Sequence, residues 1–261
     1  MNRTLWSPRP AEVVLSEKAE LASFIGAQSG MFRTYSPSYS LPQQTAAHFE
    51  IRLADGVDPL YLETYSDFME DATGVERTGY SVSVPPLEVR DPHSANTNAR
   101  PDPAMLGLLN VKYVVSEFEI ADSQLQLVDE IDGSRVYENL AVLPRAWLSV
   151  RGEPPQAVAD IQELGNSRVL KANGPGLLVY SEVYYPGWQV AVDGEPMPLT
   201  PVEGLLLGVE LGAGTHQVEF RFSPRNVYLG AAMTIGAFLA ILALAYTRVG
   251  GFFGICNASE R

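Results

Sequence analysis

The stretch VYLGAAMTIGAFLAILALAY, residues 227–246, decides the architecture of this chain because none of its residues is charged. An α-helix rises 1.5 Å per residue, so this stretch would be about 30 Å long, the thickness of the hydrocarbon core of a bilayer. Tyr228 and Tyr246 lie near its ends, where amphipathic rings favour the headgroup level, and Arg225 and Arg248 lie just outside it. A buried core helix is the alternative, and the charged flanks disfavour it. The stretch predicts one transmembrane helix, with the lipid bilayer as its partner.

Small residues recur every fourth position inside this span, at Ala232, Gly236 and Ala240. Residues four apart share one face of a helix, and small side chains let two helices approach closely in lipid. The stripe favours packing against other transmembrane helices, of the same polypeptide or of a partner. The alternative is that Ala and Gly are common in such helices, and the sequence leaves both open.

The charges beside the span do not decide its orientation. Arg221 and Arg225 precede it, and Arg248 and Arg261 follow it, so the positive-inside rule gives a tie. Residues 1–14, MNRTLWSPRPAEVV, contain no apolar signal-peptide core.

Residues 151–224 alternate between apolar and polar side chains, as antiparallel strands with one buried face do. Trp188–Val192 precede the turn Asp193-Gly194, and residues 212–214, Gly-Ala-Gly, are predicted to turn the chain between two further strands. We expect a small antiparallel β-sandwich here. Its last strand runs almost directly into the membrane helix through Ser223-Pro224, which would hold the sandwich close to the bilayer.

Residues 1–150 mix helical and strand patterns. Helical spacing is found from Ser16 to Gln28 and from Leu60 to Glu70, a strand is predicted at Met31–Tyr35, and residues 44–54 fit either class. Further segments are a polar loop at residues 91–103, a helix leading into a strand over 105–116, and a hairpin around Asp132-Gly133.

The predicted fold class is therefore α+β and predominantly β. A mixed α/β unit (1–150) is followed by an antiparallel β-sandwich (151–224), one C-terminal transmembrane helix (227–246) and a short tail (247–261).

The composition excludes several classes of protein. The net charge is −13, whereas nucleic-acid binders need a basic surface to contact phosphates. The chain has one cysteine, Cys256, which excludes an internal disulfide and a cysteine zinc cluster. His48, His93 and His216 are far apart, and none has a neighbour at metal-ligand spacing. We predict no metal, no cofactor and no nucleic-acid partner.

No catalytic motif is present, because the sequence lacks G-x-S-x-G, H-E-x-x-H, a P-loop and a dinucleotide fingerprint. Asp67, Glu70 and Asp71 are adjacent on a predicted helix, and a solvated acidic face explains them better than a glycosidase pair, which faces across a sugar from separate elements. We predict no catalytic residues.

Three aromatic residues, Tyr184, Tyr185 and Trp188, surround the predicted Pro186-Gly187 turn. They are candidates for contact with a glycan or with the membrane surface, and packing in the sandwich core is the commoner explanation for such a group. Arg145, in LPRAW, is expected to hold a carboxylate or backbone carbonyls.

Four ordered segments resemble the C-terminal portion of YfhO-like bacterial membrane proteins. They are GLLNVKYVVS (Gly107–Ser116), RVYENLAVLPRAWL (Arg135–Leu148), SEVYYPGWQVAVDG (Ser181–Gly194) and GAGTHQVEFRFSP (Gly212–Pro224). Two weaker segments, FRTYSPS and DGVDPLYLETYSDF, appear in the expected order before them.

The resemblance implies a large polytopic protein, similar to glycosyltransferases that use lipid-linked sugars, whose acidic catalytic residues lie in early loops that this sequence does not contain. It implies that the soluble part is extracytoplasmic, that residues 247–261 are cytoplasmic, and that Met1 opens a truncated or split gene product. It implies a non-catalytic tail that assists the handling of cell-envelope glycan or lipid-linked sugar. The alternative is a stand-alone membrane-anchored interaction or carbohydrate-binding module.

Overall fold

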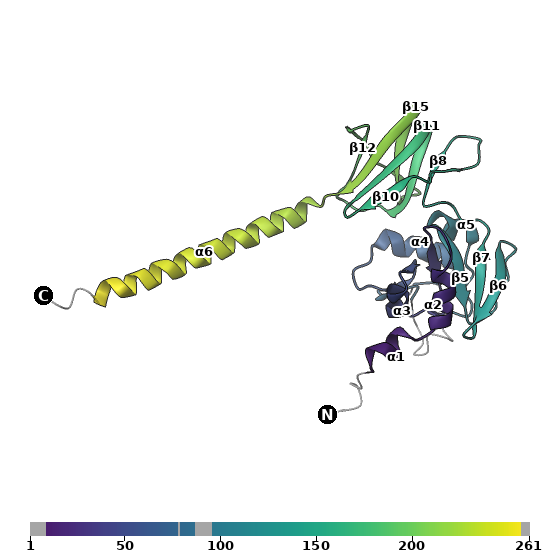
Figure 1. The fold of residues 1–261 in the computed structure, drawn as a ribbon, viewed down its shortest axis with the longest axis horizontal. Coiled ribbons are helices and arrows are strands. Elements are labelled where there is room, and N and C mark those ends of the chain that lie inside the picture. Colours follow the sequence, from purple (N-terminus) through teal and green to yellow (C-terminus); the bar gives the residue numbers. More distant parts are fainter. Residues whose placement is uncertain (1–8, 78, 87–95, 257–261) are drawn as a thin grey trace.

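A computed structural model describes residues 9–77, 79–86 and 96–256, and of residues 247–256 it describes the backbone alone. Two sheet-containing units are followed by a long helix that projects away from them (Figure 1). The helices are α1 (Ala11–Leu15), α2 (Ala19–Gly26), α3 (Gln43–His48), α4 (Glu63–Thr73), α5 (Pro103–Leu108) and α6 (Arg225–Cys256). The predicted class, α+β and predominantly β with one C-terminal apolar helix, is confirmed.

The N-terminal unit is built on a mixed five-stranded sheet of order β2-β1-β5-β7-β6. Strand β1 runs parallel to β2 and β5, and the remaining pairs are antiparallel. Parallel neighbours need a crossover connection, and α3 supplies it between β1 and β2. The strands are β1 (Arg33–Tyr35), β2 (Arg52–Leu53), β5 (Val111–Ser116), β6 (Leu125–Ile131) and β7 (Ser134–Asn139), and β3 (Gly56–Val57) pairs separately with β4 (Ser83–Val84).

Local turn chemistry explains the predictions that succeeded in this unit. Asp132 and Gly133 both have positive φ angles, 53° and 76°, as a tight hairpin between β6 and β7 requires. The ambiguous residues 44–54 contain both classes, because α3 ends at His48 and β2 begins at Arg52. The predicted polar loop at 91–103 falls partly outside the described residues, and Asp102 caps α5 by accepting from Ala104 N at 2.8 Å.

The C-terminal unit is an eight-stranded antiparallel sheet around the long strands β11 and β15. Its path is β13-β12-β15-β11-β8-β9, with β10 on β11 and β14 on β15. The strands are β8 (Ala146–Ser149), β9 (Gln156–Ala157), β10 (Ile161–Leu164), β11 (Ser167–Val183), β12 (Trp188–Val192), β13 (Glu195–Met197), β14 (Thr200–Val202) and β15 (Leu206–Phe222). Strand β8 joins this sheet although it precedes residue 151, and the division into domains at that residue stays a prediction.

The β11–β15 ribbon folds back on itself to enclose a core. Phe220 pairs with Arg168, twelve residues before Tyr180 on β11, which is roughly 40 Å along an extended strand. The rings of Tyr180 and Phe220 nevertheless stack with centroids 5.9 Å apart. Both halves of the ribbon therefore contribute to one buried cluster, in the manner of a sandwich.

Glycines permit this fold. A Cβ on Gly174 would lie 1.9 Å from the carbonyl oxygen of Gly212, so only glycine fits at this crossing. The prediction that residues 212–214 turn the chain was wrong, because β15 runs through them and stays paired with β11 on both sides of a register shift. The small residues allow β11 and β15 to approach each other closely, and they do not end β15.

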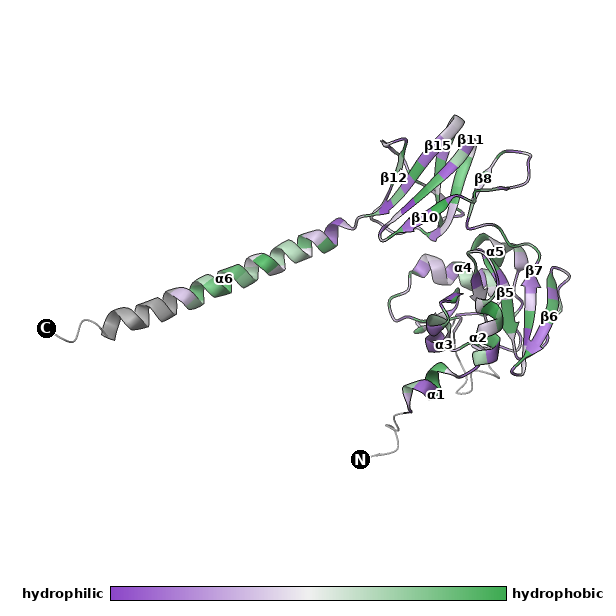
Figure 2. Ribbon diagram, viewed as in Figure 1, coloured by the Kyte–Doolittle hydropathy of each residue, from purple (hydrophilic) through white to green (hydrophobic). Residues whose placement is uncertain are grey.

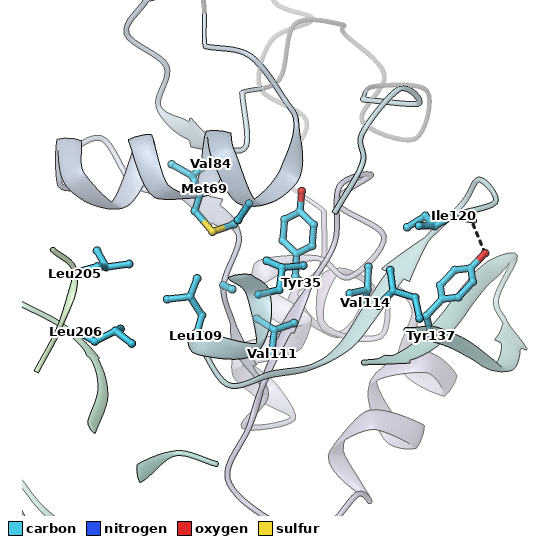
Figure 3. Close-up of a cluster of buried hydrophobic side chains, with 14 of the residues drawn as sticks. Tyr35, Met69, Val84, Leu109, Val111, Val114, Ile120, Tyr137, Leu205 and Leu206 are labelled. Carbon is cyan, nitrogen blue, oxygen red and sulfur yellow. Dashed lines mark hydrogen bonds between the residues drawn. The ribbon is translucent and has the colours of Figure 1, made fainter. Parts of the chain in front are cut away.

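The two units share a hydrophobic core (Figure 3). Leu205 and Leu206 from the C-terminal unit face Leu109 and Met69 of the N-terminal unit in this view. Trp147 of β8 and Val179 of β11 belong to the same cluster, which removes apolar surface of both units from water. The shared core fixes the position of one unit against the other.

Two residues separate the end of β15 from the start of helix α6, which is apolar along most of its length (Figure 2). Its segment Arg225–Tyr246 is the one helix in the described part of the chain that is long and apolar enough to cross a membrane, and none of it is buried in the protein. The helix continues to Cys256, through part of the predicted tail, and residues 257–261 lie outside the described residues. The chain therefore carries a candidate span where the sequence predicts one.

Candidate functional site

A hollow of about 530 Å³ lies at the junction between the sandwich and α6. We call it the juxtamembrane groove. Its wall combines the turn between β11 and β12, the end of β15 and the first turn of α6. The lining residues used below are Tyr185, Gly187, Trp188, Phe222 and Arg225. Because α6 is the candidate span, this groove lies at the entry into that span.

Three aromatic rings form one side of the groove. Trp188 lies 5.3 Å from Phe222 between ring centroids, at an interplanar angle of 50°, and Tyr185 lies 6.1 Å from Phe222. Trp188 and Phe222 are also cross-strand partners in the β12–β15 ladder. Tilted aromatic contacts of this kind are favourable and hold the rings in place.

The Pro186-Gly187 turn fixes the groove against the membrane helix. Ser223 N donates to Gly187 O at 2.7 Å, and Trp188 N donates to Tyr185 O at 3.2 Å. Gly187 has φ of +123°, and a Cβ there would lie 3.0 Å from Pro224 Cα. The predicted turn is confirmed, and its glycine is needed both for the backbone angle and for the close contact.

The structure brings together two of the three aromatic candidates. Tyr185 and Trp188 line the groove, and Trp188 also packs against the sandwich core. Tyr184 packs against that core without lining the groove and donates its backbone N–H to Leu205 O at 2.6 Å. Tyr184 therefore follows the core-packing interpretation. A role of Tyr185 and Trp188 in contact with glycan or membrane stays a prediction.

A second hollow, of about 560 Å³, lies on another side of Trp188 and includes Glu219 and Arg221. Arg221 Nη2 and Glu219 Oε1 are 2.8 Å apart, and Ser167 Oγ donates to the same carboxylate at 2.9 Å. These two partners lower the pKa of Glu219. Trp188 thus separates an aromatic groove at the helix from a charged hollow on the sheet.

A buried ionic network joins the two units. The Arg145 guanidinium is 2.5 Å from Glu182 Oε2, donates to Ser181 O, and lies 4.7 Å from the centroid of the Tyr180 ring. Burial opposes the charge of Arg145, but Glu182 and Tyr180 raise its pKa overall. The expectation that Arg145 holds a carboxylate or backbone carbonyls is confirmed, since it contacts both.

Arg33 completes this network from the N-terminal unit. Its Nη1 donates to Leu109 O at 2.8 Å and to Ser181 O at 3.0 Å, and its Nη2 lies 3.6 Å from Glu182. Burial raises the energy of ionised Glu182, but Arg145 and Arg33 hold the pKa of Glu182 below its ordinary value. The network therefore stays ionised and contributes to a fixed junction between the units.

The remaining polar candidates have structural partners. Arg77 contacts both Asp67 and Glu70 on α4, which agrees with a solvated acidic face. His216 Nδ1 lies 2.7 Å from Asp193 Oδ2. Among the described residues no group of three or more His, Cys, Asp or Glu is placed to hold a metal ion.

The stripe of Ala232, Gly236 and Ala240 lies on α6 and is exposed. A Cβ on Gly236 would meet no other atom within 4 Å. No described part of this chain covers the stripe. Packing against further transmembrane helices stays a prediction.

Residues 156–234 match the model of a family described as bacterial membrane protein YfhO. The chain contains a YfhO-like region. Two of the four resembling segments, Ser181–Gly194 and Gly212–Pro224, lie inside the match, as does the start of α6, and the other two lie before it. Comparison with curated proteins and with solved structures finds no match. The YfhO-like region therefore includes the groove, the second hollow beside Trp188 and the entry into the candidate span.

Sequence reasoning missed Glu163 and Glu182 as partners of Arg145, and Arg33 as a second cation beside Glu182. It also missed Asp55, which is buried two residues after β2. These residues carry no motif, and their partners come from other elements. The signal that was available is that Arg33 and Glu182 are charged residues directly beside runs of buried residues, Thr34–Tyr35 and Leu178–Ser181.

Proposed function

We propose that this chain is the non-catalytic extracytoplasmic part of a polytopic, glycosyltransferase-like YfhO protein, and that its juxtamembrane groove holds a cell-envelope glycan or lipid-linked sugar at the bilayer surface. The observation that carries the proposal is the position of the groove, which is built jointly from the last strand and the first turn of the candidate span. A lipid-linked sugar has its chain in the bilayer and its sugar at this level. Aromatic faces such as Trp188 stack on apolar sugar faces and also favour the headgroup region.

The geometry of the groove supports this proposal in a second way. Arg225 lines it from the helix side, where a cation can pair with the phosphate that links sugar to lipid. Tyr185 and Trp188 line it from the sheet side. Phosphate and sugar would therefore meet different walls of one groove, in the order in which they leave the membrane.

Binding of a polyprenyl-phosphate hexose to the full chain in nanodiscs tests the proposal, with bound ligand counted by native mass spectrometry. Trp188→Ala should weaken binding about tenfold, the upper end of the value of one aromatic contact. Trp188→Phe keeps a ring and should bind within about threefold of wild type. Tyr80→Ala, a matched exposed aromatic outside the groove, should bind as wild type. Equal binding by Trp188→Ala and wild type would overturn the proposal.

The orientation has its own test, since Cys256 is the single cysteine of the chain. If the sheets are extracytoplasmic, Cys256 lies beyond the span on the cytoplasmic side. A membrane-impermeant maleimide should then leave it unmodified in intact cells and modify it after permeabilisation. Modification in intact cells would reverse the proposed orientation.

A further inference from the structure

A hollow of about 360 Å³ opens where the N-terminal unit meets the end of β11. We call it the Asp55 hollow. Asp55, Asp58, Tyr61, Tyr65 and Val183 are among its lining residues. Its described lining contains two carboxylates and no Lys, Arg or His. Its volume falls within the range of small-molecule sites, and its lining has one sign of charge.

Asp55 is a buried carboxylate without a cation. Its side chain belongs to a residue only 7% exposed, and Ser36 N donates to Oδ1 at 2.8 Å. Among the described residues no Lys, Arg or His forms an ion pair with it. Burial of an unpaired ionised carboxylate is unfavourable, so such a group either has a cation as its partner or takes up a proton. Asp55 is one of the residues that line the hollow.

Two tyrosines, Tyr61 and Tyr65, line the same hollow. Tyr61 stacks on Tyr80 with centroids 6.3 Å apart and 13° between the planes, and Tyr80 does not line the hollow. One face of Tyr61 is thus covered, which leaves the other for the hollow. The hydroxyls are fixed as well: Tyr61 accepts from Ser81 N at 3.3 Å and Tyr65 donates to Ala54 O at 2.5 Å.

We propose that the Asp55 hollow binds an ammonium group, with the Asp55 carboxylate as counter-ion and the Tyr61 and Tyr65 rings as cation–π partners. A cation over an aromatic face is attracted by the ring quadrupole, and the attraction is strongest where water is excluded. A neutral polyol would leave Asp55 unpaired, so the missing charge favours a cation. Val84 and Val183 in the lining suit the methyl or methylene groups of such a ligand. This site is separate from the juxtamembrane groove.

Proton linkage distinguishes this site from a merely apolar one. Burial raises the pKa of Asp55 to about 7, and the Ser36 N–H opposes that rise. The titratable groups that face Asp55 are Tyr35, Tyr39 and Tyr65, which are neutral at this pH, and Asp58 is a second lining carboxylate. An ammonium ligand needs the ionised form, so its affinity should rise roughly tenfold between pH 6 and pH 8.

Choline and its neutral carbon isostere, 3,3-dimethylbutanol, are the probes. Both are titrated calorimetrically against the full chain in nanodiscs of phosphatidylglycerol, which carries no amine. Choline should bind saturably and the isostere should not. Asp55→Asn should weaken choline roughly tenfold or more, as loss of a charged partner does, and Tyr61→Leu about fivefold. Asp160→Asn, the same change at an exposed site outside the hollow, should bind as wild type.

The folding of each variant is checked by its thermal unfolding, and a folded Tyr61→Leu protein keeps the test valid if Asp55→Asn does not fold. Repeating the titration in phosphatidylethanolamine nanodiscs separates two sources of the ligand. Competition by this lipid supports a headgroup amine, and unchanged choline affinity supports a soluble amine. Absence of saturable choline binding, or equal binding of the neutral isostere, overturns the proposal.

Discussion

Raising the pH from 5 to 8 should destabilise this protein, and Asp55→Asn should remove most of that sensitivity. Asp55 is 7% exposed, and the neighbouring tyrosines Tyr35, Tyr39 and Tyr65 are uncharged in this range because their pKa values are raised. Burial raises its pKa from 3.8 to about 7. Asparagine keeps the shape of the side chain and the oxygen that accepts from Ser36 N, but it cannot ionise.

The sign follows from proton linkage. The native pKa lies above the unfolded value, so the stabilising contribution is fully present below about pH 4 and is lost as the pH rises through about 7. A shift from 3.8 to about 7 corresponds to about 4 kcal/mol over the whole range, at 1.36 kcal/mol per pKa unit. Between pH 5 and pH 8 the loss should be about 3 kcal/mol.

Urea unfolding of the full chain in detergent micelles measures this loss. The fluorescence of Trp147 reports it, because that residue is buried in the core shared by the two units. The exposed His216–Asp193 pair also loses stability as the pH rises, since Asp193 raises the pKa of His216. Comparing wild type with Asp55→Asn cancels that contribution. If both proteins lose equal stability between pH 5 and pH 8, Asp55 is not the source and the reasoning is refuted.

Two further variants test how the sheets are built and joined. Gly174→Ala places a Cβ against the carbonyl oxygen of Gly212 and should lower the free energy of unfolding by about 3 kcal/mol, whereas Gly212→Ala meets no atom and should change it by less than about 1 kcal/mol. If the two variants lower the free energy of unfolding equally in urea, the close approach of Gly174 to the Gly212 carbonyl oxygen is contradicted. Arg145→Ala leaves Glu182 without its closest cation and should cost about 2 to 4 kcal/mol, whereas the exposed Arg151→Ala should cost less than about 0.5. A similar cost for both would mean that the network does not stabilise the junction.

The elements that the sequence predicted well depend on neighbours along the chain. Asp132-Gly133 forms a hairpin because both residues accept positive φ angles. The candidate span is recognisable because none of the residues from Val227 to Tyr246 is charged. In both cases the deciding physical property is contained in a few consecutive residues.

The predictions that failed depend on residues far apart. Gly212 resembles a turn residue, and only its contact with Gly174, 38 positions earlier, shows why glycine stands there. Asp55 lies beside Gly56 and resembles a loop residue, but tyrosines of two other segments bury it. The candidate groove was anticipated in part, since Tyr185 and Trp188 were identified but Phe222 and Arg225 were not.

The end of β11 places these features in sequence along one segment. Ser181 and Glu182 hold the Arg145 network, Val183 lines the Asp55 hollow, and Tyr185 lines the juxtamembrane groove. Successive side chains on a strand point to opposite faces, so neighbouring residues can serve different sites without competing for space. A displacement of this segment would change all three at once. The buried network and the shared core hold this segment in place. They therefore keep the position of the Asp55 hollow constant relative to the juxtamembrane groove.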